Sequence, residues 1–240
     1  MVFRWETSRA AKCLDNLLPV DFSGVLQCDG YAAYGSFARR HSHPLTLAGC
    51  WAHVRRKFYE GRNESPLWAG WVLRQIQHLY RVEAVLRQNR AGPRLREALR
   101  SCESRMIVER LGRVLERMQP KTFPTSLLGD AIDFARGQWP RLLVFLTDGR
   151  VEIDNNQIEN AIRPTALGKK NWLFFGEAGA GERGAILYTV IESCRRRGID
   201  PYAYLKDVLT RLPSMTNRQL VVLLPANWGR MHTPALRAAA

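Results

Sequence analysis

The sequence lacks long apolar runs and closely paired cysteines. Its longest uninterrupted apolar runs, Leu142–Leu146 and Leu220–Leu224, are far shorter than the ~18 residues that a membrane-spanning helix needs. The cysteines stand far apart, without a C-x-x-C pair, at positions 13, 28, 50, 102 and 194. Neither a zinc knuckle nor a disulfide framework is therefore indicated, and we predict that all five thiols are reduced and structural.

Acidic residues are also scarce, with 22 Asp and Glu against 36 Lys and Arg, which gives the 240-residue chain a net charge of +14. This charge favours a polyanionic partner, because basic side chains release counterions from a phosphate backbone. An anionic membrane surface is the alternative. The basic clusters lie within segments that are expected to fold, and they do not line one helix opposite a Trp and Leu face. We therefore predict nucleic acid as the partner and no membrane.

The start of the sequence has no apolar stretch of the kind that a secretory signal requires, because Glu6 and Asp15 interrupt it. We expect a cytoplasmic protein of bacterial type that is associated with the nucleoid when it binds DNA. The hydrophobic fraction of 46% is ordinary for a folded chain, and the length predicts one or two domains.

The apolar pattern divides the chain into four parts: residues 1–60, 61–150, 151–212 and 213–240. The first part alternates between short apolar strands and helices. Its expected strands are Met1–Trp5, Gly24–Cys28 and Leu45–Cys50, and its expected helices are Tyr31–Arg40 and Trp51–Glu60. This alternation predicts an α/β core.

The second part is predicted to be an all-helical insertion, because apolar residues recur there at spacings of three and four. Long helices are expected over Ser65–Glu116, with a break at Ala91–Pro93. A further helix over Thr125–Thr147 is expected to bend at Trp139 and Pro140, because proline removes a backbone donor.

The third part is predicted to begin with a helix, because Asp154 followed three residues later by Gln157 has the pattern of a capping box. Pro164 is expected to kink or shorten this helix. A strand over Trp172–Phe175 and helices over Arg183–Arg197 and Pro201–Leu212 are then expected. The fourth part holds a C-terminal element and an Ala-rich tail.

A glycine-rich segment, Gly176–Gly181, has the glycine spacing of a phosphate-binding loop. Glu182 and Arg183 follow it, where such a loop needs Lys and then Ser or Thr. We therefore exclude a phosphate-binding loop and predict a mobile basic loop or turn.

Two acidic residues are the leading candidates for chemistry. Asp29 follows an apolar strand, and the carboxyl end of a buried strand is where α/β sheets place functional groups. A simple Asp-Gly turn with Gly30 is an equal alternative. Glu159 lies in the first turn of the capped helix, where an ion pair with Arg163 is the structural alternative.

Together, Asp29 and Glu159 could hold divalent metal ions against a phosphodiester, since carboxylate oxygens are the ligands that Mg²⁺ and Mn²⁺ prefer. Asp154 is interpreted as a structural cap that could also contact a metal. His53 could touch DNA phosphate or line the metal site, although a hydrogen-bonded structural histidine is the commoner case.

Several basic residues are candidates for phosphate contacts, and Trp172 could stack on a base or belong to the core. The basic candidates are Arg55, Arg56, Lys57, Arg163, Lys169 and Lys170.

Several motifs, in order along the chain, resemble transposases of the insertion sequence 66 family. They are Asp29–Tyr34, Gly49–Phe58, Asp154–Pro164, Gly168–Phe174 and Leu223–Trp228. The resemblance extends over nearly the whole chain and is far more specific than any single acid.

The resemblance implies a DNA transposase with a ribonuclease-H-like core, a helical insertion and an Asp-Asp-Glu triad that binds Mg²⁺ or Mn²⁺. In the family pattern Asp29 corresponds to the second acid and Glu159 to the third, as catalytic residues and metal ligands. The first acid lies on a strand upstream of this sequence, so the resemblance implies an incomplete core and an N-terminally truncated transposase.

We therefore expect that this chain alone does not cut or join DNA. One alternative is a non-catalytic DNA-binding or oligomerising remnant that modulates a full-length transposase, through self-association or by joining its assembly. A stand-alone nuclease of the same fold would need a replacement acid, which the sequence does not offer.

Overall fold

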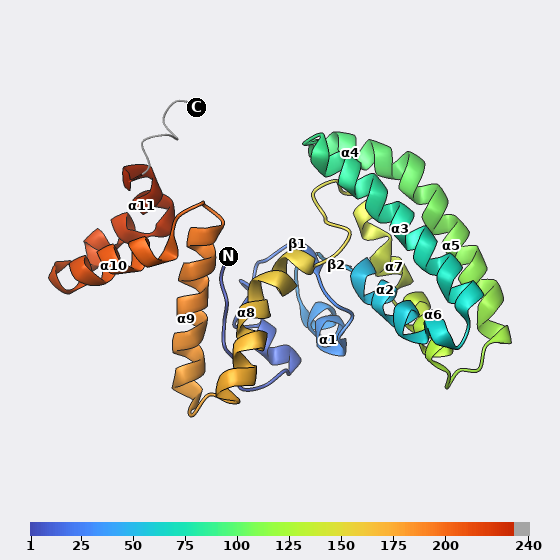
Figure 1. Ribbon diagram of the computed structural model, residues 1–240, viewed down its shortest axis with the longest axis horizontal. Helices are drawn as coiled ribbons and strands as arrows, with labels where there is room; N and C mark the ends of the chain where they lie inside the picture. The colour runs from blue at the N-terminus through green and yellow to red at the C-terminus, as the bar shows by residue number, and fades with distance from the viewer. Residues whose placement is uncertain (233–240) are drawn as a thin grey trace. The chain divides into compact units, whose positions relative to one another are not determined.

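The computed structural model describes residues 1–232, and for Lys169, Trp172, Ala178 and His232 it describes the backbone alone. The described chain consists mainly of helices, with one pair of strands (Figure 1). It divides into two compact units. The central unit is Ala10–Glu159, and the terminal unit combines Met1–Arg9 with the chain from Asn160 onward. The predicted four-part division stays a prediction.

The sheet of the central unit consists of two parallel strands, β1 (Gly24–Gln27) and β2 (Leu45–Ala48). Gly24 lies opposite Leu45 and Gln27 opposite Ala48. The helix α1 (Ala32–Arg40) connects them, as a parallel pair requires a crossover. The predicted strands and helix of this segment are confirmed, and with them the coarse α/β assignment.

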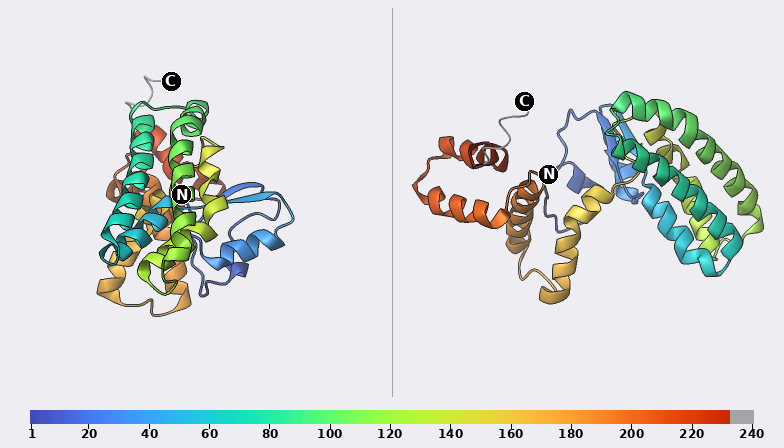
Figure 2. Two further views of the ribbon diagram at one scale, coloured as in Figure 1. Left: turned by 90° about the vertical axis from the view of Figure 1, so that its right-hand side faces the viewer. Right: turned by 45° about the horizontal axis from the view of Figure 1, so that its top comes forward.

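Helices form the rest of the central unit. They are α2 (Trp51–Glu60), α3 (Pro66–Gln88), α4 (Pro93–Leu99), α5 (Arg105–Met118), α6 (Leu127–Gly137) and α7 (Trp139–Leu142). The helices α3 and α5 run side by side (Figures 1 and 2), and a π-helical turn at Arg100–Ser104 joins α4 to α5. The predicted break before Pro93 and the predicted interruption at Trp139 are confirmed.

The core of the central unit lies between these helices and the sheet. It includes the fully buried side chains of Trp51, Phe58, Ile76, Leu111 and Ile132. The indole N–H of Trp51 donates to the carbonyl oxygen of Leu142 at 3.1 Å. The polar edge of this large residue is therefore satisfied inside the core.

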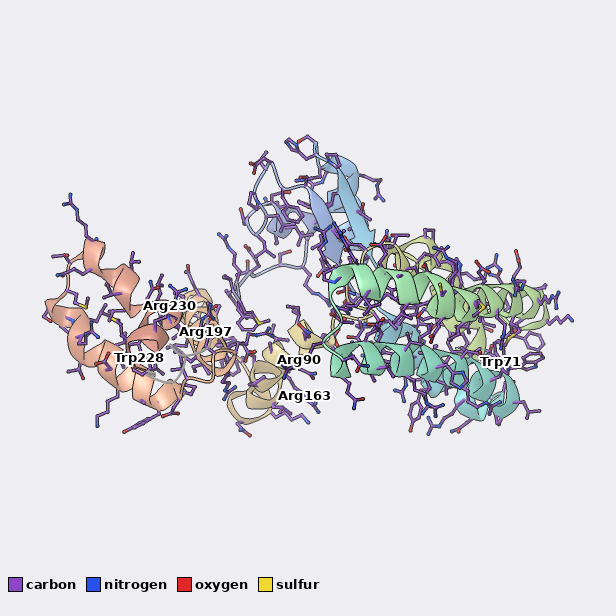
Figure 3. The ribbon with its side chains drawn as sticks, turned by 90° about the horizontal axis from the view of Figure 1, so that it is seen from above. Trp71, Arg90, Arg163, Arg197, Trp228 and Arg230 are labelled. Atoms are coloured by element: carbon purple, nitrogen blue, oxygen red, sulfur yellow. The ribbon has the colours of Figure 1, made fainter. Side chains whose placement is uncertain are left out.

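The terminal unit is helical. Its helices are α8 (Asn156–Trp172), which begins in the central unit, α9 (Ala178–Arg195), α10 (Pro201–Arg211) and α11 (Pro225–His232). Tyr204 and Trp228 pack edge to face, with ring centroids 5.5 Å apart, beside Cys194 and Ile199. Figure 3 labels Trp228. Asp200 caps α10 by accepting hydrogen bonds from the backbone of Tyr202 and Ala203.

The strand expected over Met1–Trp5 is wrong, because this segment packs on α9 as an irregular chain. The Phe3 N–H donates to Thr189 Oγ1 at 2.8 Å, and the ring of Trp5 meets that of Phe175 at 4.8 Å. These contacts hold the segment on α9 without a sheet partner, although Val2 stays 74% exposed.

The strand expected over Trp172–Phe175 is also wrong, since α8 continues to Trp172 and ends before Leu173. Leu173 has a φ of +63°, the left-handed conformation that ends many helices. Pro164 does not shorten α8, which continues on both sides of it. The missing backbone donor of Pro164 therefore does not end the helix, and the expected kink stays a prediction.

The loop expected over Gly176–Gly181 is wrong in part, because α9 begins at Ala178. A Cβ at Gly181 would lie 2.3 Å from the indole of Trp5. The glycine therefore lets the N-terminal segment approach the helix closely.

No helix in the described part of the chain is long and apolar enough to cross a membrane. All five cysteines are free, and those at positions 28, 50 and 194 are buried.

Candidate functional site

The carboxyl ends of β1 and β2 meet the segment that leads into α8. Gln27 Nε2 donates to the carbonyl of Glu152 at 2.7 Å and to that of Gly49 at 3.4 Å. The Trp51 N–H donates to the carbonyl of Ile153 at 3.1 Å. These bonds hold the start of α8 beside the strand ends, so that the first turn of α8 lies next to α2.

Asp29 follows β1 and is partly buried. Its Oδ1 accepts a hydrogen bond from the Tyr31 N–H at 3.0 Å, just before α1 begins. Gly30 has a φ of +91°, and a Cβ there would lie 3.0 Å from the side chain of Gln138. The hydrogen bond from Tyr31 to Asp29 and the positive φ of Gly30 show that the Asp-Gly turn is present. The Asp29 carboxylate also lies at the strand end, as its place after an apolar strand predicts.

Glu159 lies in the first turn of α8 and pairs with His53 of α2. The distance from His53 Nε2 to Glu159 Oε1 is 3.4 Å, and the exposed fractions of the two side chains are 14% and 44%. His53 Nδ1 is buried and has no hydrogen-bond partner among residues 1–232. Sequence spacing suggests Arg163 as a partner of Glu159 and does not reveal the pairing with His53, because two residues on different helices produce no local signal.

Asp154 is buried and anchors the start of α8. Its carboxylate accepts hydrogen bonds from the backbone and side chain of Asn156, at 3.0 and 2.9 Å, and from Tyr80 at 2.7 Å. Burial, together with the bond to this carboxylate, raises the pKa of Tyr80. Asp154 thus has the structural role that was expected, since it holds the backbone and side chain of Asn156 at the first residue of α8.

Two thiols lie close to this site. Burial raises the pKa of Cys28 and of Cys50. Hydrogen bonds from backbone N–H groups act in the opposite direction, from Gly30 to Cys28 and chiefly from Asn155 to Cys50, but burial outweighs them. Both therefore remain neutral near pH 7 and behave as small apolar residues.

The carboxylates of Asp29 and Glu159 are donors of the kind that Mg²⁺ and Mn²⁺ prefer. In the described part of the chain, however, no group of three or more His, Cys, Asp or Glu side chains lies close enough together to hold a metal ion. The described residues therefore do not complete a metal site by themselves.

The basic candidates of the central unit lie on α2 and differ in their surroundings. Arg55 is exposed, and Arg56 is exposed beside Glu60, at 3.9 Å. Lys57 instead forms an ion pair with Asp130 of α6 and lies over the ring of Phe134. Lys57 thus links two helices, which leaves Arg55 and Arg56 as the more accessible cations.

In the terminal unit, Arg163 and Lys170 are exposed on α8 (Figure 3 labels Arg163). The side chains of Lys169 and Trp172 lie outside the described residues, so their proposed contacts with DNA stay predictions. Arg163 and Lys170 are available to a phosphate backbone.

Two family models match the chain. Residues 1–183 match the model of the Transposase IS66 family, and residues 189–226 match that of the IS66 C-terminal element. No solved structure matches the chain.

Proteins of Sinorhizobium fredii are similar to the chain. It is 36% identical over 235 residues to the protein y4qI, covering 95% of the chain and 43% of that protein. It is 37% identical over 232 residues to the protein y4jD, covering 93% of the chain and 45% of that protein. Both carry the description "uncharacterized", and the chain spans less than half of their length. Because a family model covers most of its residues, the chain belongs to the IS66 family of transposases.

Proposed function

We propose that the chain is the C-terminal catalytic part of a DNA transposase of the Asp-Asp-Glu type, with a ribonuclease-H-like core interrupted by the helices α3–α7. Asp29 and Glu159 would be two of its three acids, and Mg²⁺ or Mn²⁺ the metal of the intact enzyme. The observation that carries the proposal is the pair of hydrogen bonds from Gln27 and Trp51 to the segment before α8. They hold an acid-bearing helix beside the strand end that bears Asp29.

DNA is the proposed substrate. The net charge of +14 supports a phosphate backbone as the partner, and accessible cations occur in both units. The first test is duplex DNA binding by the purified chain at increasing salt concentration. We expect the logarithm of the binding constant to fall linearly with the logarithm of salt concentration, by roughly 0.9 for each phosphate contact.

Alanine variants test which cations contact the DNA phosphates. Arg55→Ala and the double variant Arg163→Ala with Lys170→Ala are each expected to weaken binding and to lower the salt slope. Lys57→Ala is a control for charge, because its cation is already paired with Asp130. A salt-independent affinity, or equal losses in all three variants, would contradict the proposal.

We also propose that this chain alone does not cut DNA, because no group of three or more His, Cys, Asp or Glu side chains among the described residues could hold a metal ion. The purified chain should leave supercoiled plasmid intact in Mg²⁺ and in Mn²⁺. Metal-dependent nicking that is lost in Asp29→Ala and in Glu159→Ala would overturn the inactivity and would support both residues as ligands. Nicking that survives both substitutions would count against the two assignments.

A further inference from the structure

A pocket of about 520 Å³ lies in the helical part of the central unit, away from Asp29 and Glu159 in sequence. Because α3 and α5 run antiparallel (Figure 1), the start of α3 meets the end of α5, and the turn before α6 closes the pocket. Its volume is within the range of small-ligand sites. The lining residues are Glu64, Ser65, Trp68, Val114, Arg117, Met118, Lys121, Thr122, Phe123, Ser126 and Leu128.

The acid and two hydroxyls of this pocket are already engaged within the chain. Glu64 accepts a hydrogen bond from the Leu128 N–H at 3.2 Å. The hydroxyl of Thr122 donates to the carbonyl of Met118, and that of Ser126 donates to the carbonyl of Phe123. These groups are consequently poor candidates for binding a ligand.

The remaining charged groups are both cations. Arg117 and Lys121 are exposed, and neither forms an ion pair with another described residue. The indole N–H of Trp68 adds a further donor. A ligand that is complementary to this set is therefore an anion rich in hydrogen-bond acceptors.

Aromatic and apolar side chains supply the rest of the lining. Trp68 is 53% exposed and Phe123 is 82% exposed, whereas Met118 and Leu128 are buried beneath. The turn that carries Phe123 packs closely on α6, since a Cβ at Gly129 would lie 2.2 Å from the Phe123 carbonyl oxygen, and the backbone and hydroxyl of Ser126 both donate to that oxygen. Large exposed rings on an ordered frame offer flat surfaces for stacking.

We propose that this pocket binds a nucleotide of single-stranded DNA, with the base stacked on Trp68 or Phe123 and the phosphate held by Arg117 and Lys121. Rings beside cations are the combination that single-strand-binding surfaces use. A paired base in a duplex does not expose its face in this way, so an unpaired strand is the favoured form. The inference rests on the proposed function, in that DNA is the substrate, and it adds a site and the form of DNA that the site takes.

The test is fluorescence anisotropy with a short labelled oligodeoxythymidine and, separately, a labelled duplex. Trp68→Ala should weaken single-strand binding about tenfold, the order expected for one stacked base, whereas Trp68→Phe should keep most of the affinity. Arg117→Ala with Lys121→Ala should weaken it and lower the salt slope by roughly 0.7 for each phosphate that the variant no longer binds. Duplex binding should change little in these variants.

Matched controls lie beside the pocket. Leu67, which is 85% exposed, neighbours Trp68, and Arg113 is an exposed cation one turn before Arg117; neither lines the pocket. Leu67→Ala and Arg113→Ala should leave single-strand affinity unchanged. Circular dichroism of every variant shows that an altered affinity is not a folding defect.

The outcomes separate the pocket from the proposed function. Unchanged single-strand affinity in Trp68→Ala, with duplex binding intact, would overturn the pocket alone. Absence of both single-strand and duplex binding in the unaltered chain would overturn the proposed function and the pocket with it. If thymidine monophosphate displaced the labelled strand as effectively as oligodeoxythymidine does, the proposal that the pocket binds a DNA strand would be overturned. Binding of an acidic aromatic peptide in preference to DNA would overturn the assignment of a nucleotide as the ligand of the pocket.

Discussion

At the scale of single residues, Arg100 has the most demanding environment in the central unit. Its side chain is fully buried and forms two hydrogen bonds with the equally buried Glu83, at 2.6 and 2.8 Å. The same guanidinium donates to the carbonyls of Phe145, Asp148 and Val151. A buried charge of this kind is tolerated because its donors are satisfied.

Arg100→Ala should lower the free energy of unfolding by about 3–5 kcal/mol, because it leaves three carbonyls without their donor and the buried Glu83 with Arg96 as its remaining partner. Urea denaturation measures the change. Arg105→Ala, at an exposed position, is the control and should stay within about 0.5 kcal/mol of the unaltered chain. A decrease below about 1 kcal/mol for Arg100→Ala would contradict the buried network.

At the scale of elements, the segment between the 3-10 helix Val144–Leu146 and α8 is held by ion pairs. Glu152 pairs with Arg87 at the end of α3, at 3.1 Å, and with Arg96 of α4, at 2.8 Å. Gly149 lies so close to the start of α4 that a Cβ would be 1.8 Å from the Pro93 carbonyl oxygen. This segment determines where α8, and therefore Glu159, begins.

The ion pairs of Glu152 predict that the free energy of unfolding depends on pH. Burial by itself raises the pKa of Glu152, but the hydrogen bonds and charges of Arg96 and Arg87 outweigh it and hold the pKa below its usual range. A lowered folded pKa contributes stability that is present above the unfolded pKa of about 4.3 and is lost as the pH falls through the folded value. The unfolding free energy should therefore decline below about pH 4.3.

Urea denaturation between neutral and acidic pH tests this expectation. Glu152→Gln should be less stable than the unaltered chain at neutral pH, and the difference should shrink in acid. A difference that is the same at both ends of the pH range would refute the contribution of Glu152.

At the scale of the whole molecule, the first nine residues belong to the terminal unit, although they precede the central unit in sequence. Trp5 and Phe3 fasten them to Phe175 and Thr189. The terminal unit is therefore built from both ends of the described chain.

Trp5→Ala should destabilise the terminal unit by about 1–2 kcal/mol, less than the 3–5 kcal/mol of a fully buried ring, because Trp5 is 38% exposed. Hydrogen exchange should accelerate in α9 and stay unchanged in α3 and α5. Val2→Ala, at a position that is 74% exposed, is the matched control. Equal acceleration in both units would argue against two separate units.

The sequence by itself determined most helices and the pair of strands, because each has a local signal. The apolar spacing of α2 and α3, the Gly92–Pro93 break and the strand-helix-strand pattern around Asp29 need no distant partner. The family motifs are local in the same way, and they pointed to Asp29 and Glu159 as candidate acids.

Only the tertiary structure decided which distant groups meet. The pairing of Glu159 with His53, the burial of Arg100 against Glu83 and the packing of Met1–Trp5 on α9 join segments that are far apart in sequence. The N-terminal apolar residues would suit a strand equally well, and the Trp5 ring beside Gly181 makes the difference. Such choices depend on the shape and charge of the neighbouring element, which no local pattern encodes.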